Sequence, residues 1–189
     1  MKKLMIVITA AFLLIGLSSF AQEFEANTTK SELKWTGKKV TGEHWGFIVL
    51  KDGKLNIKNN KIVSGEFNID MNSINCKDLT DESWNQKLVG HLKSDDFFGV
   101  AKFPTAKLVI NESQAFNKDE AVVTGKLTIK GITHPLTFTA KRNGNTYEST
   151  ITIDRSKYDI RYGSGKFFDN LGDNMIYDEF TLEVKLVVE

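Results

Sequence analysis

The sequence predicts an all-β protein, an antiparallel barrel of eight strands with one helical insertion at about residues 78–98. Apolar and polar residues alternate with a period of two along most of the chain, and short turns rich in Gly, Asn and Asp separate the runs. The alternation is lost between Asp78 and Phe98. The first and last predicted strands are both long and regular, and closing the sheet removes two edges that would invite aggregation. A β-sandwich is the alternative architecture.

The N-terminal residues have the three parts of a secretory signal peptide. Lys2-Lys3 is a positively charged start, Leu4–Leu17 is an apolar run, and Ser19-Phe20-Ala21 supplies the small residues of a cleavage site. The run of 14 residues is shorter than the roughly 18 that a membrane-spanning helix needs. The sequence therefore predicts cleavage after Ala21, a periplasmic or secreted protein, and a mature domain at residues 22–189. An uncleaved N-terminal anchor is the alternative.

Charge and cysteine content limit the partners of the mature domain. The chain has 25 basic and 24 acidic residues, and loss of Lys2 and Lys3 changes the formal net charge from +1 to −1. This balance, without a cluster of Lys and Arg, argues against nucleic acid and an anionic membrane surface as partners. We also expect no stable membrane insertion after cleavage. Cys76 is the only cysteine, so burial and hydrogen bonds rather than an intrachain disulfide must stabilise the fold.

Four strands are predicted in the first half of the mature domain. Residues 33–38 and 44–50 form the first two, and Lys51-Asp52-Gly53-Lys54 predicts a hairpin turn. A third strand follows at residues 55–57, with a turn at Asn59-Asn60. The fourth strand has one apolar face, made of Val63, Gly65, Phe67, Ile69 and Met71.

The second half returns to strands after the helical insertion. Alternation recurs at residues 106–110, 123–129, 136–140, 147–153 and 180–186. Lys130-Gly131 and Asn143-Gly144-Asn145 supply short turns, and a loop rich in Gly, Asp and Asn runs from Gly163 to Asn174. The absence of repeats and linkers predicts a single domain.

The helical insertion is predicted to cover one end of the barrel. Trp84, Leu88 and Leu92 recur at four-residue spacing, which is one apolar stripe of a helix of about three to four turns. Phe97-Phe98 then places two large rings side by side, just before Pro104 returns the chain to extended geometry. Two adjacent rings are costly to leave in water, so this segment must cover an apolar surface.

Groups that could carry catalysis or bind a metal are sparse. His44, His91 and His134 stand apart, and neither a His-x-x-x-His nor a Cys-x-x-Cys spacing occurs. Gly163-Ser164-Gly165-Lys166 lacks the preceding glycine and the following Ser or Thr of a phosphate loop. We therefore expect no catalytic residue, no metal and no cofactor. An enzyme that uses the histidines, or a carboxylate with Arg155, is an alternative that requires two such groups within hydrogen-bond reach.

The predicted interior is apolar and aromatic. Gly37, Gly65, Gly125 and Ala140 fall on inward rows and would leave space that favours a cavity. A densely packed core is the alternative. The positions expected to line a ligand cavity are Trp35, Phe47, Phe67, Ile69, Leu92, Phe97, Phe98, Leu127, Phe138 and Ile153.

Four ordered motifs resemble the YceI-like family. They are His91-Leu92-Lys93-Ser94-x-Asp96-Phe97-Phe98, Phe103-Pro104-Thr105, residues 124–131 (TGKLTIKG) and Asp154-Arg155-Ser156-x-Tyr158. The resemblance extends from about Phe24 to Val188. Two positions depart from the family pattern. Gly99 stands where the family usually has an acidic residue, and Asp159, after the aromatic Tyr158, stands where the family usually has a glycine.

The resemblance implies an exported, lipocalin-like, eight-stranded barrel whose apolar tunnel holds a long-chain isoprenoid or similar amphiphile, without catalysis. A cation at the mouth would pair with phosphate-like oxygens of a head group, and the candidates are His91, Arg155 and Arg161. The alternative for Arg155 is a structural bridge to Asp154 or to a neighbouring strand. The alternative for His91 is a hydrogen-bond partner at a helix end.

Two non-enzymatic functions fit the sequence. The first is a carrier of a lipid-like ligand, and the second is a structural or stress-protective barrel whose interior is packed. The volume of the interior cavity discriminates between them. Exposed apolar rows beside Trp45 leave a homodimer as a further alternative.

Overall fold

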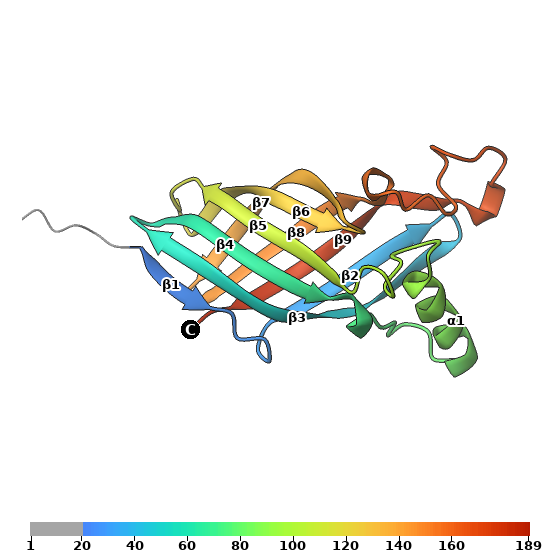
Figure 1. The fold of residues 1–189 in the computed structure, drawn as a ribbon, viewed down its shortest axis with the longest axis horizontal. Helices are drawn as coiled ribbons and strands as arrows, with labels where there is room; N and C mark the ends of the chain where they lie inside the picture. The colour runs from blue at the N-terminus through green and yellow to red at the C-terminus, as the bar shows by residue number, and fades with distance from the viewer. Residues whose placement is uncertain (1–20) are drawn as a thin grey trace, which may run out of the picture.

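The computed structural model describes residues 21–189, which form an elongated antiparallel barrel with a helix at one end (Figure 1). The closed ring runs from β2 through β9 in the order β2-β3-β4-β5-β6-β7-β8-β9, and β9 pairs with β2. The predicted eight-stranded barrel with one helix is therefore confirmed. The elements are β1 (Gln22–Glu25), β2 (Glu32–Lys39), β3 (Gly42–Lys58), β4 (Lys61–Asp70), α1 (Glu82–Lys93), β5 (Thr105–Ser113), β6 (Glu120–Ile129), β7 (Ile132–Asn143), β8 (Thr146–Asp154) and β9 (Ile176–Val187).

The predicted signal peptide lies outside the described residues, apart from Ala21. Among the described residues, no helix combines the length and the apolar composition that a membrane crossing requires.

Strand β3 replaces the two strands and the hairpin predicted around Asp52-Gly53. It runs unbroken over 17 residues, and a register shift against β4 between Leu50 and Asp52 takes up the extra residue as a bulge. Gly53 lies opposite Phe67, and a Cβ at Gly53 would overlap the phenyl ring. The hairpin prediction is wrong because the glycine here provides room for an aromatic ring on the next strand, and the chain does not turn.

The short strand β1 is absent from the sequence prediction. It pairs with the C-terminal half of β3, whereas β2 pairs with the N-terminal half, so β1 continues the wall where β2 ends. Backbone hydrogen bonds of 2.9 Å run in both directions between Glu25 and Glu189, which joins the two ends of the described chain. Four residues are too few to give a periodic signal in the sequence.

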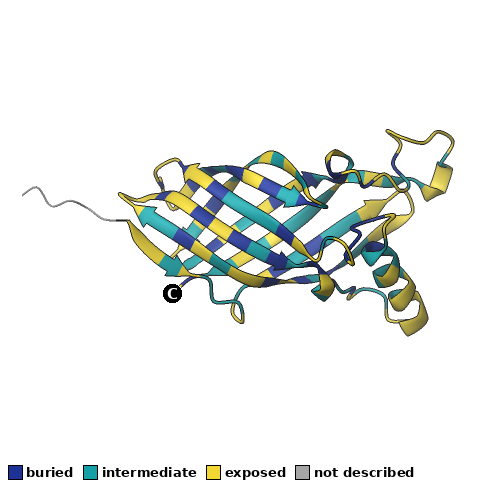
Figure 2. Cartoon of the chain, viewed as in Figure 1, coloured by how far each residue is buried: buried dark blue, intermediate teal, exposed yellow. Residues whose placement is uncertain are grey.

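Alternation along the strands separates an apolar interior from a polar exterior, which appears as bands of buried and exposed residues (Figure 2). Strand β6 follows the pattern without a break, with Val123, Leu127 and Ile129 buried. On β4 the alternation slips by one residue, because Ile62 is buried and Val63 is exposed. The predicted apolar face of β4 is therefore correct from Gly65 onward and wrong at Val63.

Residues 74–78, which we call the strap, cover an edge that β4 leaves free. Strand β4 ends at Asp70, opposite Val49, so the first half of β3 has no partner on that side. The Asn75 N–H donates to the Phe47 carbonyl at 3.1 Å, and the Lys77 N–H donates to the Trp45 carbonyl at 2.9 Å. These bonds satisfy backbone groups of β3 that would otherwise be open.

The strap leads into the lid, residues 82–98, which comprises α1 and the turn that follows it. The side chain of Asp81 caps α1 by accepting the Trp84 N–H at 3.0 Å. The helix is shorter than the predicted insertion, and its apolar stripe is incomplete: Leu92 is buried, but Trp84 is 62% exposed. Phe97 and Phe98 are buried as predicted, and their rings meet edge-on at 5.2 Å.

We expect Gly46→Ala to destabilise the protein, because a Cβ at this position would collide with the carbonyl oxygen of Asn75 in the strap. The same oxygen accepts the Nε1–H of Trp35 at 2.9 Å. Forced overpacking of this kind costs about 1–3 kcal/mol, which corresponds to a fall in Tm of roughly 3–10 °C. Thermal unfolding followed by circular dichroism measures the change.

Gly90→Ala is the matched control. A Cβ at Gly90, in the middle of α1, meets no atom within 4 Å, and alanine stabilises an exposed helix position by up to about 1 kcal/mol. If Gly46→Ala melts at or above the wild-type temperature, the strap does not sit tightly against β3.

Candidate functional site

The barrel interior contains two apolar cavities. The lid cavity has a volume of about 120 Å³ and is bounded on the lid side by Leu92, Phe97 and Phe98. The distal cavity has a volume of about 100 Å³ and lies deeper in the barrel. A buried water needs at least about 10–15 Å³, and apolar cavities of this kind stay dry. The barrel is therefore not fully packed, and its free space suits hydrocarbon.

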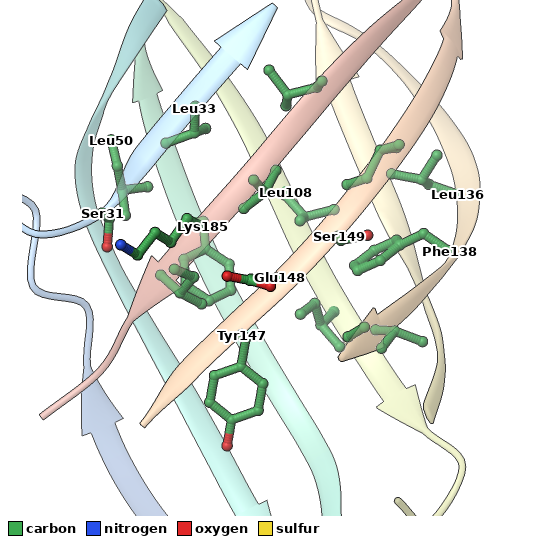
Figure 3. A pocket seen from close by; sticks show the side chains of 18 of the residues that line it. Ser31, Leu33, Leu50, Leu108, Leu136, Phe138, Tyr147, Glu148, Ser149 and Lys185 are labelled. Atoms are coloured by element: carbon green, nitrogen blue, oxygen red, sulfur yellow. The ribbon is translucent and has the colours of Figure 1, made fainter. Parts of the chain in front are cut away.

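Side chains from most strands of the barrel converge on the distal cavity. Figure 3 shows Leu33, Leu50 and Leu108 pointing into it from three different strands, with Phe138 on the opposite side. Most of the lining is aliphatic or aromatic, so the cavity offers mainly dispersion contacts. Four polar residues also border it, and they are Ser31, Glu148, Ser149 and Lys185 (Figure 3).

Four side chains line both cavities, and we call this group the waist. They are Ile69 on β4, Leu127 on β6, Ile153 on β8 and Leu182 on β9. A ligand that occupied both cavities would have to displace these side chains. Aliphatic side chains have several staggered rotamers, so rotation at χ1 and χ2 is the simplest way to open the waist.

Nine of the ten positions predicted to line a cavity do so. Those in the distal cavity are Phe67 and Phe138, those in the lid cavity are Trp35, Leu92, Phe97 and Phe98, and those in the waist are Ile69, Leu127 and Ile153.

Phe47 lines neither cavity. On β3 the buried row passes through Gly46 and Ile48, so Phe47 falls on the outward row. Its ring packs edge-on against Trp45 with centroids 5.9 Å apart. The continuous apolar run at residues 45–50 hides which of its rows faces inward, because both rows carry large side chains.

Small residues account for only part of the free space. Gly37 lines the lid cavity and Ala140 lines the distal cavity, as expected. The space beside Gly65 is taken by side chains of the neighbouring strands, and the carbonyl of Val109 lies against Gly125. These two glycines therefore allow close packing instead of creating a cavity.

The barrel wall is incomplete between β7 and β8. Ladder pairs join only residues 141–143 to residues 146–148, next to the hairpin, although both strands continue beyond them. We call the unpaired part, residues 133–140 of β7 and 149–153 of β8, the seam. Leu136 and Phe138 face the distal cavity beside it and are only partly buried. Ser149 Oγ bridges the seam by donating to the Thr139 carbonyl at 2.8 Å.

Pro135 explains why β7 tolerates an unpaired edge. Ile129 and Ile132 flank the two-residue turn between β6 and β7, so hydrogen-bonded and non-bonded pairs alternate from that point. Pro135 pairs with Lys126 at a non-bonded position, and its nitrogen therefore faces β8. Because proline has no N–H, it could not donate to a ladder across the seam.

Arg155 is the buried cation of the lid cavity. It is 2% exposed, and its guanidinium donates to the carbonyls of Tyr177, Ile160 and Ile176 at 2.9–3.1 Å. Asp178 lies 3.6 Å away, too far for a hydrogen bond. Burial lowers the pKa of Arg155, although the nearby carboxylates oppose the shift. The geometry matches the alternative of a structural bridge, made to the start of β9.

The other two head-group candidates line neither cavity. The ring of His91 lies between Tyr162, at 4.3 Å, and Phe97, at 5.8 Å. Arg161 is exposed, pairs with Asp159 and lies over the ring of Phe167 at 5.0 Å. Arg161 therefore lies on the surface near the lid, whereas His91 belongs to the lid itself, and its Nε2 is buried without a hydrogen-bond partner among the described residues.

The two cavities offer no set of metal ligands. Among the described residues that line them there is no histidine, cysteine or aspartate.

The sequence prediction omitted two features that the chain does signal. Leu182 belongs to the regular alternation of β9, and Pro135 within a predicted strand indicates an edge.

Solved structures with the same fold share little sequence with this chain. BcnA from Burkholderia cenocepacia superposes with a TM-score of 0.65 at 24% identity, covering 87% of this chain and 99% of that chain. A polyisoprenoid-binding domain from Saccharophagus degradans, implicated in plant cell wall breakdown, gives 0.58 at 16% identity, with coverages of 88% and 97%. A YceI protein from Campylobacter jejuni gives 0.52 at 19% identity, with coverages of 68% and 73%.

Proteins that are similar in sequence match only part of this chain. A UPF0312 protein from Shewanella denitrificans is 34% identical over 95 residues, 49% of this chain and 46% of that protein. One from Pseudomonas putida is 44% identical over 81 residues, 38% of this chain and 42% of that protein. The chain thus matches less than half the length of these relatives. A family model described as a YceI-like domain matches residues 24–188, nearly the whole described barrel, and the chain belongs to this YceI-like family.

Proposed function

We propose that this protein is an exported, non-enzymatic carrier that holds a long-chain isoprenoid or a similar amphiphile inside the barrel. The observation that carries the proposal is the pair of apolar cavities inside the barrel, which meet at the four side chains of the waist and leave apolar space unfilled on both sides of it. The Saccharophagus degradans neighbour, described as polyisoprenoid-binding, supports the same ligand class. The signal-peptide pattern at residues 1–21 supports a periplasmic or secreted location.

Apolar burial alone can supply useful affinity. Each buried CH₂ contributes about 0.8 kcal/mol, so a chain that filled both cavities would gain several kcal/mol without a catalytic group. The waist must open for such a ligand, and the seam gives β7 and β8 freedom to move apart because few backbone bonds join them. Binding therefore requires side-chain rotation at the waist, and the seam is the place where β7 and β8 could separate to admit the ligand.

A packed barrel without a ligand is the second candidate. It is favoured by the small volume of each cavity, about 100 and 120 Å³, and by the side chains that separate them. The two candidates differ in whether the waist opens, which binding measurements can test directly.

Native mass spectrometry of the mature protein, purified from its own host, tests the carrier function. We expect a hydrophobic molecule bound at near one-to-one stoichiometry, which denaturing extraction would release for identification. An empty protein that also failed to bind added isoprenoids would leave the packed barrel.

Because the waist separates the two cavities, we expect the affinity for a ligand to depend on the length of its hydrocarbon chain. We expect the wild-type protein to bind isoprenoid alcohols more tightly as they lengthen, by roughly fourfold per additional buried CH₂ at most. Leu127→Phe narrows the waist and should confine the ligand to one cavity, so that the affinity stops rising with length. Isothermal titration with a series of alcohols measures this slope.

Val63→Phe is the control, because it adds the same ring on the exposed face of β4. It should leave the slope of affinity against chain length unchanged. An unchanged slope in Leu127→Phe as well would mean that the ligand does not pass the waist.

Arg155 is predicted to stabilise the fold rather than to select a head group. Arg155→Met would leave three buried carbonyls without their donor, and we expect a loss of about 2–4 kcal/mol in the free energy of unfolding. Urea denaturation followed by tryptophan fluorescence measures it. Arg161→Met, at an exposed site, should change it by less than about 0.5 kcal/mol. An Arg155→Met protein of normal stability that lost affinity only for anionic amphiphiles would instead assign Arg155 to the head group.

A further inference from the structure

Outside the barrel interior, the fold brings His44 next to Cys76 and Asp78, which lie about thirty residues later in the sequence, and all three side chains are of types that bind metals. His44 comes from the start of β3, and Cys76 and Asp78 come from the strap. The donor atoms of the three side chains all lie within 4.8 Å of one another. The His44 Nδ1 is 2.7 Å from one carboxylate oxygen of Asp78, and the Cys76 Sγ is 3.3 Å from the other.

The cluster is held in place by bonds that do not involve its own donor atoms. The Lys77 N–H donates to the Trp45 carbonyl, which fixes the strap between the two ligands that it carries. Asn85, on α1, donates from its side chain to the carbonyls of Cys76 and Leu79 at 3.0 and 2.9 Å. The three side chains therefore stand on backbone that is already ordered, which lowers the entropic cost of binding an ion.

The Asp78 carboxylate collects three hydrogen bonds. Besides His44 and Cys76, the backbone N–H of Trp45 donates to it at 2.8 Å. Partial burial raises the pKa of this carboxyl, but the three hydrogen bonds outweigh that effect and lower it overall. Burial raises the pKa of the Cys76 thiol. The cluster therefore has a negative oxygen pair with protons of His44 and Cys76 directed at it.

The donor set matches one class of ion. Thiolate and imidazole ligands favour zinc and neighbouring transition metals over calcium or magnesium, which prefer oxygen. Tetrahedral bonds to nitrogen, oxygen and sulfur place ligand atoms roughly 3.5 Å apart. In the cluster the donor atoms lie 2.7 and 3.3 Å apart in two pairs and all within 4.8 Å, so small side-chain rotations would bring them to that spacing. The side chains of His44 and Asp78 are 29% and 22% exposed, so solvent can reach a fourth position.

We propose that His44, Cys76 and Asp78 bind a zinc-class divalent ion at the junction of the strap and β3. The ion would replace the two protons that now face the carboxylate. The thiol proton leaves to solvent as the Cys76 sulfur binds the metal as thiolate. A His44 ring that binds the ion through Nδ1 carries its proton on Nε2, so that the Nδ1 lone pair is free for the metal. Water completes the coordination, and no group is oxidised or reduced.

Such an ion would join the strap, and through it the lid, to β3. The cluster lies outside the two cavities, since none of its residues lines either of them. Metal binding is therefore separable from binding of an apolar ligand, and failure of one does not affect the other.

Cobalt is the spectroscopic probe for the site, and the protein used is the untagged mature chain after treatment with a chelator. We expect one equivalent of Co²⁺ to give a thiolate-to-cobalt charge-transfer band, which Zn²⁺ then removes by displacement. Calorimetric titration with Zn²⁺ alone should give one site. At a hundredfold excess over its Kd, zinc should raise Tm by about 5 °C or more.

Three variants make the experiment specific. Cys76→Ser should abolish the charge-transfer band, and His44→Gln should weaken zinc binding at least about tenfold. His134→Gln is the matched control, because His134 bonds to the Lys157 carbonyl elsewhere on the surface, and it should bind zinc like the wild type. Thermal unfolding without metal confirms that each variant is folded.

The proposal is overturned if no saturable binding occurs below about 1 mM metal, or if the band persists in Cys76→Ser. It is also overturned if His134→Gln weakens binding as much as His44→Gln. Variants that lose thermal stability while the wild type binds no metal would leave the cluster as a hydrogen-bonded attachment of the strap to β3.

Discussion

The hydrogen bonds between β2 and β9 turn a long antiparallel sheet into a barrel, and the interior depends on them. Seven residue pairs join the two strands, and without them two edges would be open to other chains. Closure forces one row of every strand to face a common axis. Since those rows are apolar, they enclose a hydrophobic column, and eight strands leave an interior that side chains almost fill. The two cavities are the remainder.

The two ends of the column are finished differently. At one end β1 and the residues near Glu189 bond to each other and extend the wall. At the other end β4 stops early, and the strap and lid take its place with side-chain and backbone bonds of irregular geometry. The regular strands thus form most of the barrel wall and bury its apolar side chains. The irregular strap carries Cys76 and Asp78, which meet His44 of β3, and the lid covers one end of the lid cavity.

The sequence predicted the barrel, its single helix and most of the cavity lining because all three follow from alternation and from one loss of alternation. The sequence prediction failed where one local pattern is compatible with two structures. Asp52-Gly53 suggests a turn but accommodates Phe67 within one long strand. Phe47 lies in a run where both rows are apolar. The cluster of His44 with Cys76 and Asp78 was not predictable, because residues about thirty positions apart meet only through the path of the strap.

Pro135 has a consequence for how this protein behaves among other proteins. A strand edge with free N–H and C=O groups is a template on which another extended chain can add, and this is a common start of aggregation. Along the seam that template is interrupted, because Pro135 turns a nitrogen without a hydrogen toward the gap. A foreign strand could not form a continuous ladder there. The barrel can therefore keep an incomplete wall and still resist edge-to-edge association with its neighbours.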